Sequence, residues 1–198
     1  MDLVLSSLPL PIRLKLERPV SDAQLMQFSS RNRPLRMERE ASGEILVMTP
    51  TGNRTGMINL RLGRLFDEWT EADGRGFGFD SSTGFRLPNG AVRSPDLAWV
   101  AKERWNALTY EEQEGFGLCP DFVIELASPS DRLADVRKKI AEEWIVNGVE
   151  LAWLLDPQRK VVEVYRPGEE PEIHEQPTSV QGDGPVAGFE LVMARIWG

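Results

Sequence analysis

The run Asp121–Leu126 constrains the fold more than any other segment of the chain. It reads Asp-Phe-Val-Ile-Glu-Leu, which has the length and apolar content of a buried β-strand. A carboxylate at Glu125, inside such a strand, costs free energy unless it is paired or binds a cation. The fold must therefore bring a partner to Glu125.

A second short apolar strand, Asp96–Val100, also carries an acid, at its first residue. If the two strands are neighbours, Asp96 and Glu125 can point into one cleft at the edge of the sheet. Two carboxylates placed in this way would bind Mg²⁺ or Mn²⁺, because these ions prefer oxygen ligands. In the alternative reading, Asp96 caps a turn after Pro95 and Glu125 pairs with an arginine on the next helix. The spacing alone leaves both readings open.

The remaining patterns predict helices and strands in alternation. Helices are expected after an N-cap at Ser21, from about Ile58 to Ala72, as a broken pair over Lys102–Glu114, and over Arg132–Val146 behind a cap in Ser128–Asp131. Further strands are expected at Arg36–Glu40, Ile45–Thr49, Phe77–Phe79, Gly84–Leu87, Val149–Leu155 and Lys160–Tyr165, followed by a polar tail over Gly168–Gly182 and a return to the core at Phe189–Ile196. This order predicts an α/β (α+β) fold with a mixed β-sheet flanked by helices.

Length and composition indicate one globular unit. The chain has 198 residues, 41% of them hydrophobic, which suits a single domain over residues 21–198. Residues 1–20 contain Pro9, Pro11 and Pro19 without a clear period, so we expect an N-terminal arm. There is no apolar run of membrane-spanning length and no leader pattern, so a cytoplasmic protein without a membrane partner is expected.

The scarcity of cysteine and histidine excludes several mechanisms. Cys119 is the single cysteine, expected to be buried and unreactive, and His174 is the single histidine, expected to face solvent. Thiol, Ser-His-Asp and histidine-rich zinc chemistries therefore have little support. The net charge of −8 also disfavours unspecific nucleic-acid binding, so a nuclease would have to rely on its site.

The helix predicted after Ser130 supplies cations that can lean back over the Glu125 strand. A lysine there could stabilise charge on a phosphate. Lys138 fits an outer charged face better, whereas for Lys139 the two uses are balanced. Glu38 is a weaker third acid, and its alternation with Glu40 favours a solvated face.

Several separate motifs resemble the Uma-type family of putative restriction endonucleases. They are Ser81–Phe85, Leu87–Gly90, Arg93–Asp96, Cys119–Asp131, Asn147–Pro157 and Val164–Gly168, which occur in the family's order and extend the resemblance over nearly the whole chain from about Pro19. The resemblance implies a PD-(D/E)XK nuclease core, that is, a restriction endonuclease-like fold in which an Asp and a Glu bind a divalent metal.

The resemblance also implies roles for individual residues. Asp96 matches the acid of the Pro-Asp motif and Glu125 the second acid, so both are expected as metal ligands. Ala127 stands where the superfamily usually has its lysine, and Lys139 best fits a lysine that has moved to the following helix, although Lys138 stays open. Glu38 matches an early acid that assists the metal or orients a water, and Ser128 is expected as a helix cap.

The expected function is Mg²⁺- or Mn²⁺-dependent hydrolysis of DNA phosphodiester bonds, with Asp96, Glu125, Lys139 and Glu38 as catalytic residues. A homodimer or higher homo-oligomer is expected, because nucleases of this fold that cut both strands often pair. A catalytically inactive binding or assembly module is the alternative, which Ala127 and the charge of −8 favour modestly. Hydrolysis of RNA or a nucleotide is a weaker third reading.

Overall fold

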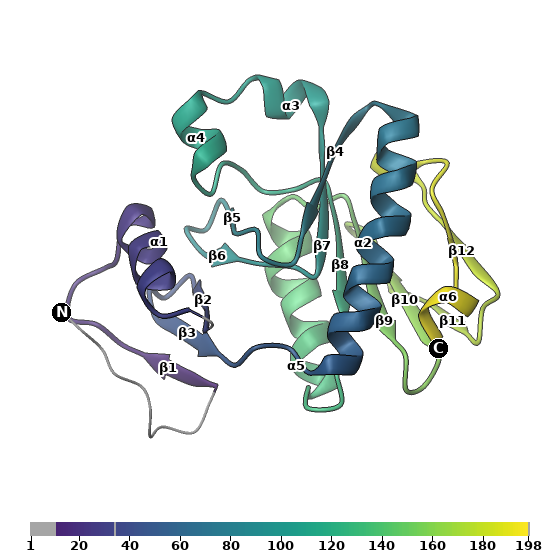
Figure 1. The fold of residues 1–198 in the computed structure, drawn as a ribbon, viewed down its shortest axis with the longest axis horizontal. Helices are drawn as coiled ribbons and strands as arrows, with labels where there is room; N and C mark the ends of the chain where they lie inside the picture. Colours follow the sequence, from purple (N-terminus) through teal and green to yellow (C-terminus); the bar gives the residue numbers. More distant parts are fainter. Residues whose placement is uncertain (1–10, 34, 198) are drawn as a thin grey trace.

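A computed structural model describes residues 11–33 and 35–197, and a mixed β-sheet forms its centre (Figure 1). Its strands are β4 (Gly76–Asp80), β7 (Leu97–Ala101), β8 (Phe122–Leu126), β9 (Leu151–Asp156), β10 (Val161–Tyr165) and β11 (Glu172–Glu175). The order across the sheet is β11-β10-β9-β8-β7-β4, in which β8 and β9 are parallel and the other neighbours antiparallel. The predicted mixed sheet is confirmed, and β7 and β8 are neighbours.

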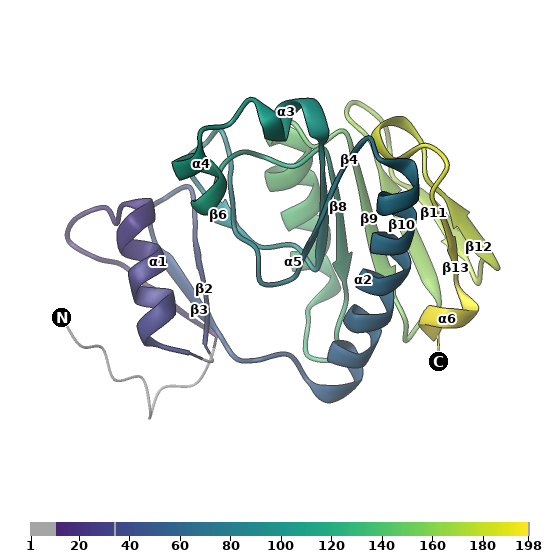
Figure 2. The ribbon, with the colours of Figure 1, turned by 45° about the horizontal axis from the view of Figure 1, so that its top comes forward.

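Helices cover the two faces of this sheet (Figure 2). One face packs against α2 (Asn53–Asp73), α6 (Ala194–Trp197), the short η3 (Gly184–Val186) and the hairpin of β12 (Ser179–Gln181) and β13 (Glu190–Val192). The opposite face packs against α5 (Leu133–Lys138) and its continuation. In β8, Phe122, Ile124 and Leu126 belong to the α2 core and Val123 to the α5 core. Strand alternation therefore turns Glu125 towards α5.

A second sheet lies beside the first and carries Glu38. Its order is β1-β3-β2-β6-β5, with bounds β1 (Ile12–Leu14), β3 (Ile45–Met48), β2 (Arg36–Arg39), β6 (Val92–Arg93) and β5 (Phe85–Arg86). The predicted hairpin is confirmed as β2 and β3. Helix α1 (Asp22–Arg31) packs on this sheet, and its predicted N-cap is confirmed, because Ser21 Oγ accepts from the backbone N–H of Gln24.

Two segments in which no strand was predicted, the N-terminal arm and the polar tail, contain strands. β1 lies in the predicted arm and pairs with β3, while residues 1–10 of that arm are outside the described residues, so the division into arm and domain stays a prediction. The polar tail contains β11 and β12. β11 is the edge strand of the large sheet and is largely exposed, which explains its polar sequence. Without a buried face, such a strand has no apolar alternation that would reveal it.

The predicted helix Arg132–Val146 is helical over nearly that span but is not uniform. α5 continues into a π-helical turn, η1 (Lys139–Trp144), and a 3₁₀ turn, η2 (Ile145–Asn147), and ends at Gly148 with φ 106°. The expected cap in Ser128–Asp131 is wrong, because the residue at the N-cap position is Arg132 and it makes no side-chain cap bond. Instead, Asp131 accepts a hydrogen bond from the Ser128 N–H at 2.7 Å, which closes the preceding turn.

The remaining expectations concern isolated features. The broken pair Lys102–Glu114 is confirmed as α3 (Lys102–Asn106) and α4 (Tyr110–Glu114). Cys119 is buried, and burial raises the pKa of its thiol to about 12. His174 lies on β11, partly exposed and 3.2 Å from Glu172. Among the residues that the structure describes, we find no helix with the length and apolarity needed to span a bilayer.

Candidate metal centre

Glu125 lies near the end of β8, a strand in which every residue is buried. The side chain turns to the α5 face, where its Oε1 accepts a hydrogen bond from Trp144 Nε1 at 2.6 Å and lies 2.8 Å from Lys139 Nζ. The alternative reading predicted an arginine on the next helix as its partner. The helix is the predicted one, but the cation is a lysine.

Asp96 stands opposite Glu125 in the antiparallel ladder of β7 and β8. Leu97 pairs with Ile124, and the Asp96 N–H donates to the Ile124 carbonyl at 3.0 Å, which extends the ladder by one residue. Asp96 Oδ2 accepts from the Leu126 N–H at 2.8 Å, and Oδ1 accepts from Asn59 Nδ2 at 2.9 Å. The carboxylate therefore does not cap its own turn. It is tied to β8 and to α2.

Helices on opposite faces of the sheet thus hold the two acids. α2 reaches Asp96 through Asn59, whereas the α5 side reaches Glu125, and the two residues lie opposite each other just before β7 begins. A groove of about 530 Å³, lined in part by Asp96, Asn59, Arg64 and Phe79, opens beside Asp96. A substrate could reach this end of the sheet through the groove.

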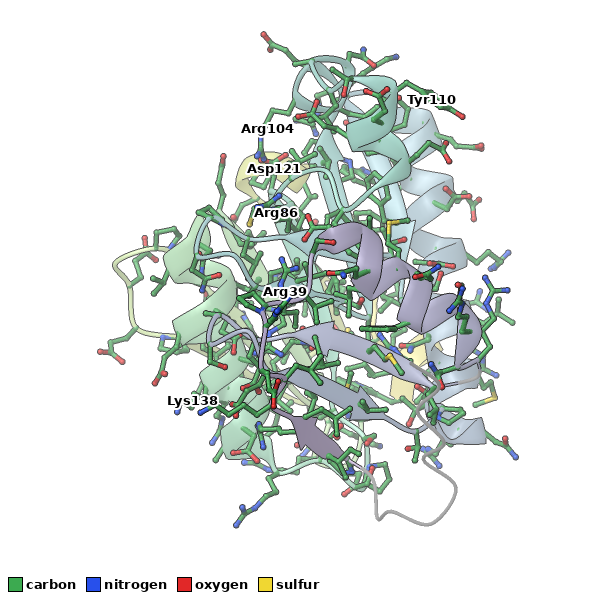
Figure 3. All side chains as sticks on the ribbon, turned by 90° about the vertical axis from the view of Figure 1, so that its left-hand side faces the viewer. Arg39, Arg86, Arg104, Tyr110, Asp121 and Lys138 are labelled. Carbon is green, nitrogen blue, oxygen red and sulfur yellow. The ribbon has the colours of Figure 1, made fainter. Side chains whose placement is uncertain are left out.

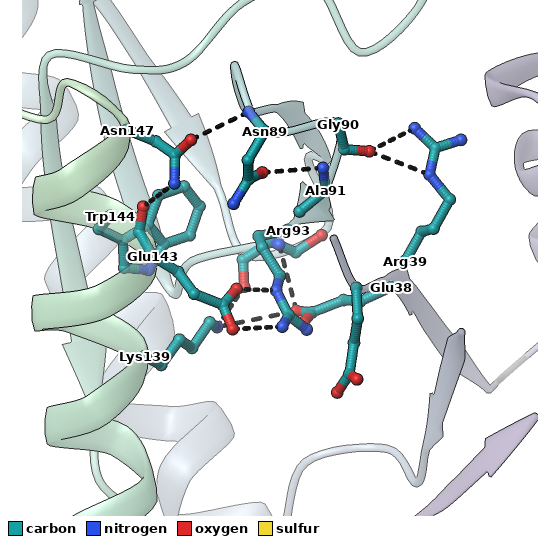
Figure 4. Close-up of polar contacts among 12 residues, drawn as sticks. Glu38, Arg39, Asn89, Gly90, Ala91, Arg93, Lys139, Glu143, Trp144 and Asn147 are labelled. Carbon is teal, nitrogen blue, oxygen red and sulfur yellow. Dashed lines mark hydrogen bonds and ion pairs between the residues drawn. The ribbon is translucent and has the colours of Figure 1, made fainter. Parts of the chain in front are cut away.

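Glu38 is not on a solvated face, so that expectation is wrong. Its exposed fraction is 3%, its Oε2 accepts from Arg93 at 3.0 Å, and its Oε1 accepts from the Ser94 N–H at 3.1 Å (Figure 4). The cause is long-range pairing, because Arg39 of β2 is paired with Val92 of β6. This register brings Glu38 against Arg93, which also binds the Glu143 carboxylate.

Lys139 is the lysine that reaches the acids. Its Nζ lies 2.8 Å from Glu125, 3.7 Å from Glu38 and 3.3 Å from the Ser94 carbonyl oxygen. Ser94 is therefore held at its N–H by Glu38 and at its C=O by Lys139, two residues before Asp96. Lys138 instead points outward from the helix (Figure 3), with 68% of its side chain exposed and Glu142 at 3.7 Å.

The charges of this cluster depend on one another. Burial raises the pKa of Glu125 to about 7, and the neighbouring Asp96 adds to the rise while Lys139 opposes it. Burial also raises the pKa of Glu38, but Lys139 and Arg93 outweigh it and hold that pKa below its usual value. Burial and Asp96 both disfavour the ionised form of Glu125. A further positive charge beside these carboxylates would favour that ionised form.

The oxygen atoms at this place fit a hard divalent ion. Mg²⁺ typically takes one or two carboxylates and keeps several waters, and Asp96 and Glu125 supply such a pair. Asn59 Oδ1, on the amide that holds Asp96, is buried and has no hydrogen-bond partner among the described residues. Within the described part of the chain no group of three His, Cys, Asp or Glu side chains forms a metal site. These residues therefore suit an ion that keeps water ligands better than one coordinated by protein side chains alone.

Several residues of the cluster were not predicted. Arg93 stood in the motif Arg93–Asp96 without a role, and only the β2–β6 pairing reveals one. Asn59 and Glu143 are polar positions on predicted helices, where a solvated face is the usual interpretation. Trp144 is fully buried, and its hydrogen bond to Glu125 depends on tertiary packing. No local sequence signal could have identified these contacts.

The geometry defines a mixed-sheet α/β protein in which Asp96 and Glu125 lie opposite each other on neighbouring strands and a partly buried lysine contacts Glu125. Comparison with protein families identifies the family of the chain. A family model described as Uma2, putative restriction endonuclease, matches residues 22–194, and the chain belongs to this family. Membership agrees with the resemblance seen in the sequence motifs.

One solved structure with the same fold is a putative nuclease belonging to DUF820 from Anabaena variabilis ATCC 29413. The TM-score is 0.72 at 18% sequence identity, and the alignment covers 90% of this chain and 98% of that chain. At this identity the likeness establishes the fold alone. Among curated proteins, no match was found.

Proposed function

We propose that the protein is a metal-dependent endonuclease that hydrolyses phosphodiester bonds in DNA. The observation that carries the proposal is the placement of Asp96 and Glu125 opposite each other on neighbouring strands, with Lys139 against Glu125. The family's description as restriction endonucleases and the nuclease title of the similar structure support the same class.

In this proposal Asp96 and Glu125 hold Mg²⁺ or Mn²⁺. When bound, the ion supplies an activated water and neutralises charge on the scissile phosphate. The chain's own contribution is position: the Leu126 N–H and Asn59 orient Asp96, while Trp144 and Lys139 orient Glu125. Fixed ligands of this kind need little reorganisation during the reaction.

Lys139 has the second role, as a cation beside the reacting phosphate. Burial lowers its pKa, but Glu125 and Glu38 outweigh burial and raise it, so the side chain carries its charge at neutral pH. Ala127 stands where the superfamily usually has a lysine, and this absence had favoured an inactive module. In the proposal Lys139 takes the role of that missing lysine. Both oxygens of Glu38 are engaged by Arg93 and Ser94, so we propose that Glu38 acts by holding Lys139 and the segment before Asp96.

The test is nicking of supercoiled plasmid by purified protein with Mg²⁺ or Mn²⁺. We expect the wild type to nick, and Asp96→Ala and Glu125→Ala to lose activity while circular dichroism shows a folded protein. Asp183→Ala removes an acid that pairs with Arg166 on the surface, away from the centre, and should cut like the wild type. Activity that survives in both folded site variants would rule out the mechanism.

Two further arms of this assay decide the finer points. A single-stranded RNA of matched sequence tests the sugar, and cleavage of RNA without cleavage of DNA would overturn the choice of substrate. We also propose a homodimer, which light scattering behind size exclusion would measure. A wild type that neither cuts nor binds Mn²⁺ would identify the inactive binding or assembly module instead.

A further inference from the structure

We propose that Trp144 is a positioning residue, which with Lys139 anchors one oxygen of Glu125 and leaves the other oxygen to face the metal ion. This inference rests on the proposed function for the ion itself. The contact between Trp144 and Glu125 is independent of it, and the experiment separates the two.

Both donors reach the same oxygen atom. Trp144 Nε1 donates to Glu125 Oε1 at 2.6 Å, and Lys139 Nζ lies 2.8 Å from that oxygen. No donor among the described residues bonds to Oε2, and this atom keeps a small contact with solvent although the side chain is only 8% exposed. The carboxylate is thus fixed at one oxygen and open at the other.

The π-helical turn is what brings the two donors together. Lys139 and Trp144 are the first and last residues of η1. In an α-helix of 3.6 residues per turn, residues five apart point about 140° away from each other. In a π-helix the hydrogen bond runs from i to i+5, so the same two residues lie roughly one above the other. The turn therefore puts both side chains on the face that meets β8.

The surroundings keep the indole in place. Trp144 is fully buried in the core between α5 and the sheet, and Lys139 Nζ stands 5.6 Å from the centre of its ring. The charged group and the aromatic face attract each other at such a distance. The indole thus contacts both Lys139 and Glu125.

The test compares Trp144→Phe with Trp153→Phe. Both tryptophans are fully buried, but Trp153 Nε1 has no hydrogen-bond partner among the described residues. The two variants lose similar volume, and only the first loses a bond to Glu125. Mn²⁺ affinity by calorimetry should fall about 10- to 100-fold in Trp144→Phe, the usual range for loss of an outer partner of a metal ligand, and stay within about twofold in Trp153→Phe.

A second readout uses the wild type and does not depend on whether the variant folds. In a ¹H–¹⁵N spectrum with assigned indole signals, the Trp144 Nε1–H should lie downfield of an unbonded indole and shift on Mg²⁺ titration. Equal loss of affinity in both variants, no loss in Trp144→Phe, or an ordinary indole shift that ignores Mg²⁺ would overturn the proposal. If the wild type binds no Mn²⁺, the proposed function fails. The contact itself is then tested by comparing the Trp144 indole shift in the wild type and in Glu125→Ala. The same shift in both proteins would overturn the positioning contact.

Discussion

At the scale of single residues, the adjacent Lys138 and Lys139 have opposite surroundings, and comparing them tests the site directly. Lys139 lies among Glu125, Glu38 and Ser94, whereas the exposed Lys138 pairs with the exposed Glu142 of the next turn. We expect Lys139→Ala to lower the cleavage rate by about 10²- to 10³-fold, the effect of removing one preorganised donor at a developing charge. Lys138→Ala should cut within about twofold of the wild type, and plasmid nicking rates measure both. Equal rates for the two variants would remove Lys139 from the mechanism.

A second prediction at this scale concerns acid stability. Glu163 is 3% exposed and accepts hydrogen bonds from Arg137 and from the Tyr165 hydroxyl at 2.7 Å. Burial raises the pKa of Glu163, but these partners outweigh it and hold that pKa below its usual value. The stabilisation is therefore complete above the unfolded pKa of about 4.3 and is lost as the pH falls through the folded pKa.

Glu163→Gln should consequently unfold more easily than the wild type at pH 7, with a smaller difference at pH 3. Urea unfolding at the two pH values gives both free energies. Glu172→Gln, which alters an exposed acid on β11, is the control and should show little difference at either pH. A Glu163→Gln deficit of equal size at pH 3 and pH 7 would contradict the ion-pair explanation.

At the scale of elements, strand β4 depends on a glycine that permits close packing. A Cβ built on Gly76 would lie 2.2 Å from the Trp99 side chain and 2.5 Å from the Val100 carbonyl oxygen. Gly76→Ala should cost about 1–3 kcal/mol in the free energy of unfolding, because the backbone cannot yield as a flexible side chain can.

Gly63→Ala is the matched change at a site with room. Gly63 lies inside α2, and nothing stands within 4 Å of a Cβ built there. The variant should gain about 0.5–1 kcal/mol, since alanine is the better helix former. Denaturant unfolding measures both variants, and a neutral Gly76→Ala would show that β4 and β7 pack less closely than described.

The elements also show what could be predicted from sequence. β7 and β8 were predicted as two short apolar strands that each carry an acid, but their adjacency was only a condition of the metal-site interpretation, and the structure supplies it. The π turn was not predicted, because the apolar residues of Arg132–Val146 were interpreted with the α-helical period alone. The joint contact of Lys139 and Trp144 with one oxygen of Glu125 could therefore not be predicted from the sequence. β6 was also missed, as a two-residue strand carries no periodicity.

At the scale of the whole molecule, the large sheet separates two apolar cores that share its strands. Alternate residues of β8 belong to the α2 core and the α5 core, so neither core can come apart without the other. Cys119, a buried residue of the α5 core, offers a probe of this coupling. Its thiol, with a pKa of about 12, should react with a maleimide at pH 8 only when the chain unfolds.

We expect Cys119 labelling and tryptophan fluorescence to give one common midpoint in guanidinium chloride. Because the six tryptophans include Trp153 in the α2 core and Trp144 in the α5 core, the fluorescence reports both. Labelling at lower denaturant than the fluorescence change would show that the α5 side opens separately.

The candidate metal centre also depends on pairing between strands that are far apart in the sequence. Glu38 comes from β2, Arg93 from β6, Asp96 from the residue before β7, Glu125 from β8 and Lys139 from η1, so the cluster exists only in the assembled fold. The net charge of −8 makes this local arrangement the determinant of any action on DNA.

The most direct test of the account is calorimetric titration of the purified protein with Mn²⁺. The wild type should bind one ion per chain, and Asp96→Asn and Glu125→Gln should each abolish binding while melting as folded proteins, with Asp183→Asn unchanged. Binding of Mn²⁺ with wild-type affinity by both site variants would contradict the claim that Asp96 and Glu125 share one metal ion.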